Sequence, residues 1–171
     1  MGRSAILFDR DGTLNVDRGY TFRPDDLVWT PGAREAVKRV NDAGFLAVVI
    51  TNQSGVARGF YDEADVMAFH AAMNADLDKF GAHLDALYYC PFHAEASVTA
   101  YRHADHPDRK PNPGMLLRAM AELDLDPGRT AMIGDQPSDI AAAAAAGIRG
   151  ALYQGGDLAL LASDVLAELA G

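Results

Sequence analysis

Short apolar runs alternate with longer amphipathic stretches along the whole chain. The amphipathic stretches carry apolar residues three and four positions apart, which is the period of a helix with one buried face. The apolar runs are unbroken, as in strands buried on both faces of a parallel sheet. This alternation predicts an α/β fold, a three-layer α/β/α sandwich around a mainly parallel, Rossmann-like sheet. The predicted strands cover residues 5–8, 45–50, 86–90, 130–133 and 149–153, and the predicted helices cover 30–43, 62–80, 112–123, 138–146 and 157–169.

Capping residues set the predicted helix ends. Thr30 is predicted to be the N-cap of the first helix, with Pro31 at its first helical position. Asp62 and Asp157 are the predicted N-caps of two later helices. The loops are too short for a helical cap domain, so the sequence predicts a single domain of residues 1–171 whose loops shape the pocket. These loops cover residues 14–29, 53–61 and 91–112.

Composition narrows the class of protein. The chain has 171 residues, of which 49% are hydrophobic and 23% charged, as in an ordinary globular protein. No apolar run approaches the roughly 18 residues of a membrane span, and the first predicted strand begins too early to leave room for a signal peptide. The single cysteine, Cys90, excludes an internal disulfide and fits a reducing cytoplasm. We therefore expect a cytoplasmic protein with no membrane partner; the sequence leaves the oligomeric state open, with a monomer favoured.

The net charge of −9 argues against a nucleic-acid partner, because phosphate backbones are held by Lys and Arg surfaces. Six of the 15 Lys and Arg residues nevertheless fall in or beside predicted loops at one edge of the sheet. An acidic body with a basic mouth suits a small phosphate ester bound together with Mg²⁺. The six residues are Arg10, Arg18, Arg23, Arg58, Arg109 and Lys110.

Polar residues that could carry chemistry follow the predicted strands. Asp9 and Asp11 follow the first strand, and Thr51 follows the second. Lys110 ends the long loop after the third strand, and Asp135 follows the fourth. The carboxyl ends of parallel strands lie on one edge of a sheet, so these side chains can converge. Unpaired buried carboxylates cost roughly several kcal/mol each, so the two acids after the first strand indicate a metal, a phosphate or both.

Each of these residue types suits one part of phosphate-ester hydrolysis. The Asp9 carboxylate can attack phosphorus in line and form an acyl phosphate. Asp11 can protonate the leaving oxygen and later take a proton from water. The Thr51 hydroxyl and the Lys110 ammonium group can stabilise the developing negative charge. Mg²⁺ prefers oxygen ligands, which Asp9, Asp135 and a backbone carbonyl would supply.

These motifs, in this order, resemble the haloacid dehalogenase (HAD) superfamily of aspartate phosphatases. The motifs are Asp9-x-Asp11-Gly12-Thr13, Thr51, Lys110 and Gly134-Asp135-x-x-x-Asp139. Within the superfamily, the sequence is most similar to the D-glycero-D-manno-heptose 1,7-bisphosphate phosphatases, which belong to the histidinol-phosphate phosphatase-like subfamily. The segments that carry this closer similarity are residues 9–12, 17–20, 51–59, 90–91 and 109–115.

The resemblance implies a Mg²⁺-dependent phosphomonoester hydrolase that acts through an aspartyl-phosphate. The implied catalytic residues are Asp9 as nucleophile, Asp11 as general acid and base, and Thr51 and Lys110 on the transferred phosphate. The implied Mg²⁺ ligands are Asp9, Asp135 and the backbone carbonyl of Asp11. The residues implied to contact the substrate are Asp17, Arg18, Gly19, Tyr20, Thr51, Asn52, Gln53, Ser54, Arg58, Arg109, Lys110 and Gln136.

Three functions compete at this level. The first is removal of the 7-phosphate of heptose 1,7-bisphosphate, in the supply of activated heptose for the lipopolysaccharide of a bacterial envelope. The second is histidinol-phosphate hydrolysis, because those phosphatases share the motifs at residues 9–13 and 109–111. They typically carry Asp where this chain has Ser54, which favours the heptose substrate. The third, a non-catalytic phosphosugar-binding protein, is disfavoured because every catalytic group is present.

The long third loop departs from the family pattern. The family usually holds a structural zinc there through Cys-x-His and Cys-x-Cys, at positions that this chain fills with Cys90, Phe92, His106 and Asp108. The alternative is a substitute zinc site, since His and Asp also bind zinc. Its candidate ligands are Cys90, His93, His103 or His106, and Asp108. Because their spacing matches no known closed site, the sequence predicts a loop without zinc.

Four residues receive interpretations outside the chemistry. Asp139, at the start of the alanine-rich helix, is expected to support the site or to stabilise the helix dipole. Cys90 is expected to be a small buried hydrophobe. His70 and His83 are expected to face solvent.

Overall fold

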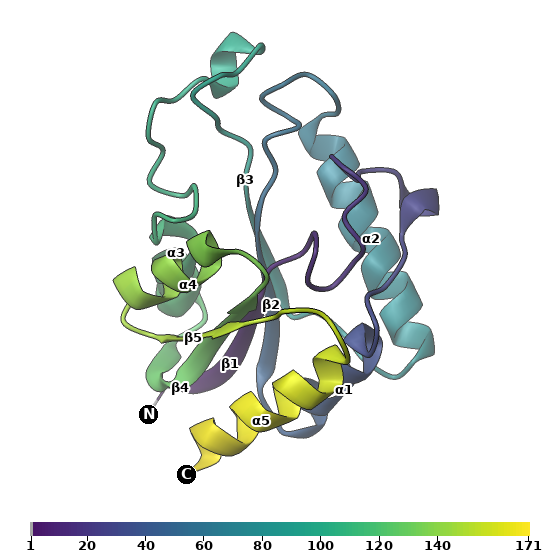
Figure 1. The fold of residues 1–171 in the computed structure, drawn as a ribbon, viewed down its shortest axis with the longest axis vertical. Helices are drawn as coiled ribbons and strands as arrows, with labels where there is room; N and C mark the ends of the chain where they lie inside the picture. The colour runs from purple at the N-terminus through teal and green to yellow at the C-terminus, as the bar shows by residue number, and fades with distance from the viewer. Residues whose placement is uncertain (1) are drawn as a thin grey trace.

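The computed structural model describes residues 2–171 and contains a five-stranded parallel sheet between two layers of helices (Figure 1). The strands are β1 (Arg3–Phe8), β2 (Leu46–Asn52), β3 (Ala86–Cys90), β4 (Leu125–Gly134) and β5 (Arg149–Leu152). The α-helices are α1 (Ala33–Asp42), α2 (Glu63–Lys79), α3 (Gly114–Glu122), α4 (Pro137–Ala145) and α5 (Leu158–Ala170). The predicted α/β/α sandwich is confirmed.

The strand order is β3-β2-β1-β4-β5, and every neighbouring pair is parallel. The chain first adds β2 and β3 on one side of β1 and then returns to add β4 and β5 on the other side. Such a reversal opens a crevice at the carboxyl ends of the two strands that flank it, here β1 and β4. Asp9 follows β1 and Asp135 follows β4, so both acids lie at this crevice.

Successive side chains of the central strand face different helix layers. Ile6 and Phe8 belong to a core shared with α1, α2 and α5, whereas Ala5 and Leu7 belong to a core shared with α3 and α4. All four side chains are fully buried. Figure 1 shows α3 and α4 on one side of the sheet and α1 and α2 on the other. Burial on both faces explains why the first apolar run shows no alternation of polar and apolar residues.

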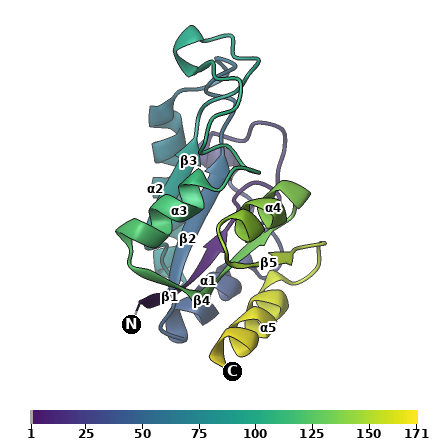
Figure 2. The ribbon, with the colours of Figure 1, turned by 90° about the vertical axis from the view of Figure 1, so that its left-hand side faces the viewer.

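Three connections border the carboxyl edge of the sheet: residues 14–29, 53–61 and 91–112. The first contains a 3₁₀ turn at Pro24–Asp26 and the third a 3₁₀ turn at Thr99–Tyr101, so none of them builds a cap domain. The connection after β3 extends farthest from the sheet in both views (Figure 2). Among the described residues, no helix has the length and apolar character needed to cross a bilayer.

The first helix begins two residues later than predicted. α1 begins at Ala33, and its N-cap is Gly32 rather than Thr30. The Thr30 hydroxyl is directed at the backbone carbonyl of Thr13, to which it donates at 2.5 Å, and α1 begins two residues beyond the position that Thr30 would cap. Gly32 has φ of 74°, and a Cβ at this position would collide with the Asp157 carboxylate. Glycine is therefore required where α1 meets the start of α5.

Other boundaries agree more closely. Asp62 and Asp157 cap α2 and α5 through their side chains, as predicted. β2 extends to Asn52, beyond its predicted end, and β4 begins at Leu125 with an irregular register ahead of the predicted strand. The prediction that His70 faces solvent is wrong, because only 5% of this residue is exposed.

Candidate active site

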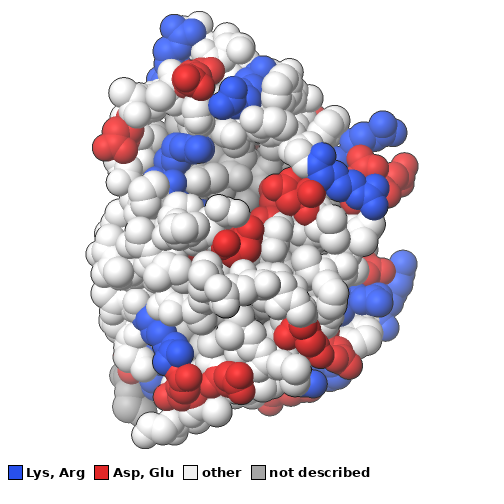
Figure 3. Space-filling view, viewed as in Figure 1, with Lys and Arg blue, Asp and Glu red and all other residues white. Residues whose placement is uncertain are grey.

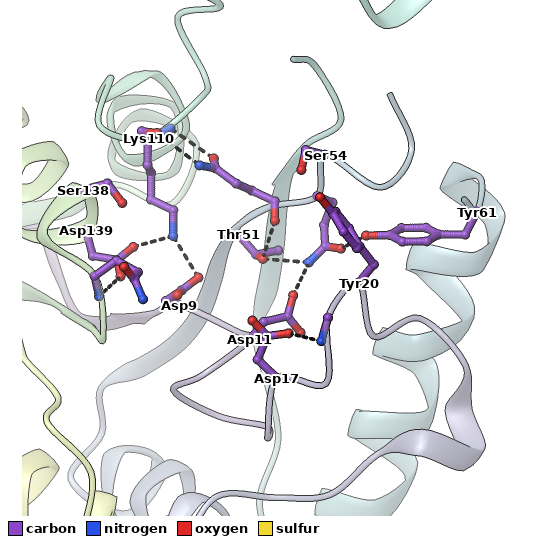
Figure 4. Close-up of a pocket in the computed structure, with 14 residues that line it drawn as sticks. Asp9, Asp11, Asp17, Tyr20, Thr51, Ser54, Tyr61, Lys110, Ser138 and Asp139 are labelled. Carbon is purple, nitrogen blue, oxygen red and sulfur yellow. Dashed lines mark hydrogen bonds and ion pairs between the residues drawn. The ribbon is translucent and has the colours of Figure 1, made fainter. Parts of the chain in front are cut away.

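Asp9 lies at the centre of the crevice, immediately after β1 (Figure 4). Its backbone N–H donates to the carbonyl of Ile133 in β4 at 2.9 Å, which fixes the residue against the neighbouring strand. Its carboxylate Oδ1 accepts from Nζ of Lys110 at 2.9 Å. Asp9 is 7% exposed and reaches the cavity described below. A substrate can therefore reach this carboxylate only from the cavity.

Lys110 is the buried cation of the site and is only 4% exposed. Besides Asp9, its Nζ donates to Oδ1 of Asp139 at 2.6 Å and to the carbonyl of Ile50 at 2.8 Å. Burial lowers the pKa of Lys110, but the two carboxylates outweigh it and the net effect is a raised pKa. Lys110 therefore stays charged at neutral pH, next to the candidate nucleophile.

The Asn52 amide positions Lys110. Its Nδ2 donates to the Lys110 carbonyl at 3.1 Å, and its Oδ1 accepts from the Lys110 backbone N–H at 3.0 Å. The end of β2 and the end of the third connection are thereby held together. Asn52 lines the cavity, and its side-chain contacts in this structure orient the lysine.

Three carboxylates meet beside Lys110. Across residues 2–171, Asp9, Asp135 and Asp139 form the one group of three or more His, Cys, Asp or Glu whose ligand atoms lie within 4.8 Å of one another. The pKa of Asp9 is raised to about 8 in total: burial raises it most, Lys110 lowers it, and the Asp139 charge and the close Asp135 carboxylate raise it. A further positive charge beside Asp9 would favour its ionised form.

Two neutral donors orient the Asp135 carboxylate without compensating its charge, so it can still bind a cation. Its Oδ1 accepts from the Thr13 hydroxyl and its Oδ2 from Nε2 of Gln136, both at 3.0 Å. A Cβ on Gly12 would lie 2.5 Å from Asp135 Oδ2, so glycine is required for this close approach. Oxygen ligands from Asp9 and Asp135, with excess negative charge, fit Mg²⁺. Asp139 is the poorer ligand because both of its oxygens are engaged, Oδ1 by Lys110 and Oδ2 by the backbone N–H of Gln136.

The Asp11 carboxylate is held by a different set of donors. Oδ1 accepts from Arg10 and from Nδ2 of Asn15 at 3.0 Å, and Oδ2 accepts from Nε2 of Gln53 at 3.0 Å. The same Gln53 nitrogen lies 2.9 Å from the Thr51 hydroxyl oxygen. Gln53 thus links the candidate acid and base to the candidate phosphate-binding hydroxyl.

These side chains surround an open cavity of about 300 Å³. Figure 3 shows a hollow in the middle of this face, with basic side chains above and to its left and acidic side chains toward its lower right. A cavity of this size is suited to a small metabolite. Its lining residues are Asp9, Asp11, Asp17, Gly19, Tyr20, Thr51, Asn52, Gln53, Ser54, Tyr61, Lys110, Gln136, Ser138 and Asp139.

Most of the residues predicted to contact substrate line this cavity, and three do not. Arg18 is exposed at the outer end of the first connection. Arg58 and Arg109 are not among the lining residues; burial lowers the pKa of Arg109, and the Arg58 charge lowers it further. Arg58 Nε and Arg109 Nη1 are buried without a hydrogen-bond partner among the described residues.

Two lining residues carried no assignment from sequence. Tyr61 lies before the capping residue of α2, and its hydroxyl donates to Oε1 of Gln53 at 2.5 Å. Ser138 lies in the first turn of α4, three residues after Asp135. The nearness of Ser138 to an acid-bearing strand end was a usable signal. Nothing in the local pattern marked Tyr61.

Aromatic stacking organises the long third connection where the family usually has zinc. The rings of Phe92 and His106 stack with centroids 4.0 Å apart and planes 3° apart, and His103 packs edge-on against His106. The Nδ1 atoms of His93, His103 and His106 each accept a backbone N–H two residues further on. Cys90 is fully buried, as expected. The candidate zinc ligands Cys90, His93, His106 and Asp108 are thus placed by local contacts.

Comparisons with known proteins agree with this geometry. Residues 108–163 match the family model for HAD-hydrolase-like proteins. The chain is 42% identical over 168 residues to the D-glycero-beta-D-manno-heptose-1,7-bisphosphate 7-phosphatase of Rhodopseudomonas palustris, covering 98% of this chain and 92% of that protein. The chain belongs to the HAD superfamily of hydrolases, in the family of the heptose-1,7-bisphosphate phosphatases.

Two solved structures are similar over nearly the whole chain. A protein described as a HAD-like phosphatase from Mesorhizobium loti superposes with a TM-score of 0.89 at 33% identity, covering 98% of this chain and 88% of that one. The D,D-heptose 1,7-bisphosphate phosphatase of Bordetella bronchiseptica, complexed with magnesium and phosphate, superposes with a TM-score of 0.85 at 31% identity, covering 96% of this chain and 99% of that one. The HAD-like fold is thereby confirmed.

Proposed function

We propose that this chain is a Mg²⁺-dependent phosphatase that removes the 7-phosphate of D-glycero-D-manno-heptose 1,7-bisphosphate through a phosphoaspartate on Asp9. One observation carries the proposal: the buried Asp9 carboxylate lies 2.9 Å from the Lys110 ammonium group and beside the Asp135 carboxylate at the strand-order reversal. A nucleophile, a fixed cation and metal ligands therefore converge at one cavity. The name of the Rhodopseudomonas palustris relative supports the choice of substrate.

The residues support a two-step transfer. In the first step an Asp9 oxygen attacks phosphorus, the bond between phosphorus and the sugar oxygen breaks, and Asp11 donates a proton to that oxygen. In the second step Asp11 takes a proton from water, the water oxygen attacks phosphorus, and the Asp9 carboxylate is released. Lys110 and the Thr51 hydroxyl stabilise the charge on the phosphoryl oxygens in both steps.

The metal would be held by Asp9, Asp135 and the backbone carbonyl of Asp11. When bound, Mg²⁺ supplies charge that allows two anions, the carboxylate and the phosphate, to approach each other. The raised pKa of Asp9 supports this assignment, because the carboxyl needs additional positive charge to act as an ionised nucleophile at neutral pH. The magnesium in the Bordetella bronchiseptica relative supports it as well.

The second phosphate of the substrate is assigned to Arg58 and Arg109. Two partly buried guanidinium groups, each with one buried N–H donor that has no partner among the described residues, suit a bound dianion. His93 lies near both: burial lowers its pKa, and the two arginine charges lower it further, so it is a neutral neighbour. The only ion pair that Arg58 makes in the described residues is a long one, 3.7 Å, with the exposed Glu95.

Turnover of candidate substrates tests the proposal. The purified chain is assayed with both anomers of heptose 1,7-bisphosphate and with histidinol phosphate, with and without Mg²⁺. We expect Mg²⁺-dependent release of the 7-phosphate, and Asp9→Asn should abolish it while the protein stays folded. Faster release from histidinol phosphate would transfer the assignment to that substrate.

Arginine variants test the second phosphate site. Arg58→Gln and Arg109→Gln should lower kcat/KM for the bisphosphate by about tenfold or more, the usual cost of a charge-assisted hydrogen bond, and change kcat/KM for the 7-monophosphate little. Arg129→Gln, at the far end of β4, is the control and should change neither. Equal losses on the two substrates would contradict the assignment. We further propose a cytoplasmic, monomeric enzyme of one domain, which sizing chromatography of the purified protein checks for the oligomeric state.

A further inference from the structure

Arg10 is the largest side chain in the protein that is fully buried, and it lies directly beneath the catalytic edge. Its Nε and Nη2 donate to Asp11 Oδ1 at 3.1 and 2.9 Å, and Nη2 also lies 3.1 Å from Asp11 Oδ2. Nη2 donates further to the carbonyl of Thr21 at 2.7 Å. With an exposed fraction of 0%, this arginine cannot touch a substrate in the cavity.

The guanidinium group also faces the amide of Gln53. Gln53 Oε1 lies 3.3 Å from Arg10 Nη2 and 2.5 Å from the Tyr61 hydroxyl. A guanidinium group can only donate, and burial raises the pKa of Tyr61 to about 12, so the phenol keeps its proton. Two donors therefore fix the carbonyl end of the amide. The opposite end, Nε2, is then directed at Asp11 and Thr51.

The far side of Arg10 is closed by α2. Its guanidinium carbon lies 4.4 Å from the centre of the Phe69 ring, in a cation–π arrangement. Nη1 lies 3.5 Å from Nε2 of His70. Burial lowers the pKa of His70 to about 3, and the Arg10 charge lowers it as well, so this histidine stays neutral and adds no second positive charge. Arg10 is thus enclosed by the connection after β1, by Gln53 and by α2.

We propose that Arg10 is a positioning residue for proton transfer: with Tyr61 it sets the orientation of Gln53, and through its fork it holds the Asp11 carboxylate where the leaving oxygen receives its proton. This inference rests on the proposed role of Asp11. The planar fork contacts both oxygens of one carboxylate and a neighbouring amide together, which a lysine ammonium group cannot reproduce. Arg10 acts on the leaving-group proton and leaves the attack by Asp9 untouched.

Substrates with different leaving groups separate this role from a general structural one. A sugar phosphate has a strongly basic leaving oxygen that needs a proton, whereas p-nitrophenyl phosphate has a weakly basic one that leaves without it. For both substrates kcat/KM reports the steps up to phosphorylation of Asp9. We expect Arg10→Lys to lower kcat/KM by about tenfold or more for the sugar phosphate and by less than about threefold for p-nitrophenyl phosphate. Equal losses on the two substrates would overturn the proposal.

Arg34→Lys is the matched control. Arg34 also has a carboxylate partner, Asp76 at 3.4 Å, and an aromatic ring, Phe80 at 5.2 Å, but it lies on α1 away from the cavity. It should change neither rate. Thermal unfolding of each variant reports whether it is folded. If Arg10→Lys does not fold, Tyr61→Phe replaces it, because this variant removes one of the two donors that orient Gln53; it must show the same selective loss, and an equal loss would overturn the proposal.

Asp11→Asn separates failure of this inference from failure of the proposed function. If Asp11→Asn shows the selective loss and the folded Arg10 variant does not, Arg10 has no positioning role and the assignment of Asp11 stands. If Asp11→Asn itself lowers both rates equally, Asp11 is not the acid, and both the assignment and the inference that rests on it are overturned.

Discussion

The Asp139 carboxylate joins Lys110 to the start of a helix. Its Oδ1 accepts from Nζ of Lys110 at 2.6 Å, and its Oδ2 accepts from the backbone N–H of Gln136 at 3.0 Å, the N-cap residue of α4. A single buried side chain therefore places the third connection and the first turn of α4 relative to each other. Replacement of Asp139 or Lys110 should lower both the free energy of unfolding and the activity.

Removal of the Lys110 charge should destabilise the protein most in the absence of Mg²⁺. Lys110→Met leaves Asp9, Asp135 and Asp139 close together without their cation, and breaking a buried ion pair costs about 3–5 kcal/mol. Added Mg²⁺ should restore more stability to the variant than to the wild-type protein. Urea unfolding with and without Mg²⁺ measures both effects. Lys38→Met, which breaks an exposed pair with Asp42, should cost less than about 1 kcal/mol; a similar cost at the two positions would contradict the prediction.

Gly12→Ala should weaken Mg²⁺ binding by at least about tenfold, as changes behind metal ligands commonly do. The new Cβ would lie 2.5 Å from Asp135 Oδ2 and would displace this ligand. The variant should also be destabilised by about 1 kcal/mol, because alanine is strained at a φ of 85°. Gly81→Ala is the control, because its φ of 76° introduces the same backbone strain while no atom lies near the new Cβ. Mg²⁺ dependence of activity measures the difference, and an unchanged dependence in Gly12→Ala would refute it.

His70 should make the protein less stable below neutral pH. Burial holds the folded-state pKa of His70 near 3, below the unfolded value of 6.5, so its contribution to stability is complete above pH 6.5 and is lost as the pH falls toward 3. Between pH 7.5 and pH 5 this single group should cost about 2 kcal/mol. His70→Gln can still accept from Arg10 but does not titrate. Urea unfolding at the two pH values should show a smaller loss for the variant by about this amount; parallel losses would show that His70 is not responsible.

The third connection should fold without zinc. Phe92 and His106 stack on each other at two positions where related sequences carry zinc ligands, and the histidine Nδ1 atoms already accept backbone N–H groups. Elemental analysis of protein purified without added metal should find far less than one zinc per chain. A stoichiometric zinc signal would contradict the prediction. Phe92→Ala should then loosen this connection, seen as faster proteolysis at residues 91–112 than in the wild-type protein.

The layers of the fold were predictable because local patterns and buried faces agreed. The first apolar run lies between two helix layers, so it had no polar face, and a strand buried on both sides was the simplest interpretation. The candidate nucleophile and metal ligand, Asp9 and Asp135, were predictable because each follows a strand on one edge of the sheet, whereas Lys110, at the end of the connection after β3, was predictable from the order of the motifs. Asp9, Lys110 and Asp135 are indeed brought together there.

Long-range contacts account for what local patterns missed. Thr30 has the right chemistry for an N-cap, but its hydroxyl is oriented toward the carbonyl of Thr13. His70 has the spacing of the buried face of α2, four residues after Val66 and three before Met73, but a polar side chain is usually exposed; it is buried because it packs against Arg10, sixty positions away in the chain. Arg10 itself was expected at the basic mouth, because a charge beside a loop is normally exposed. The strand order, too, depends on crossover choices that leave no local mark.

The central strand β1 is more constrained than the connections that surround the cavity. Both neighbours of β1 bond to it along its length, so the strand that presents Asp9 is held on each side. The connections around the cavity leave the sheet from three different strands, β1, β2 and β3. Their outer parts can therefore be lengthened or shortened without shifting the strand register, provided that Gln53 and Lys110, which hold the site together, are kept. Loop transplantation is thus a direct route to the hydrolysis of other phosphate esters, because Asp9 stays in place while the residues that contact the substrate are replaced.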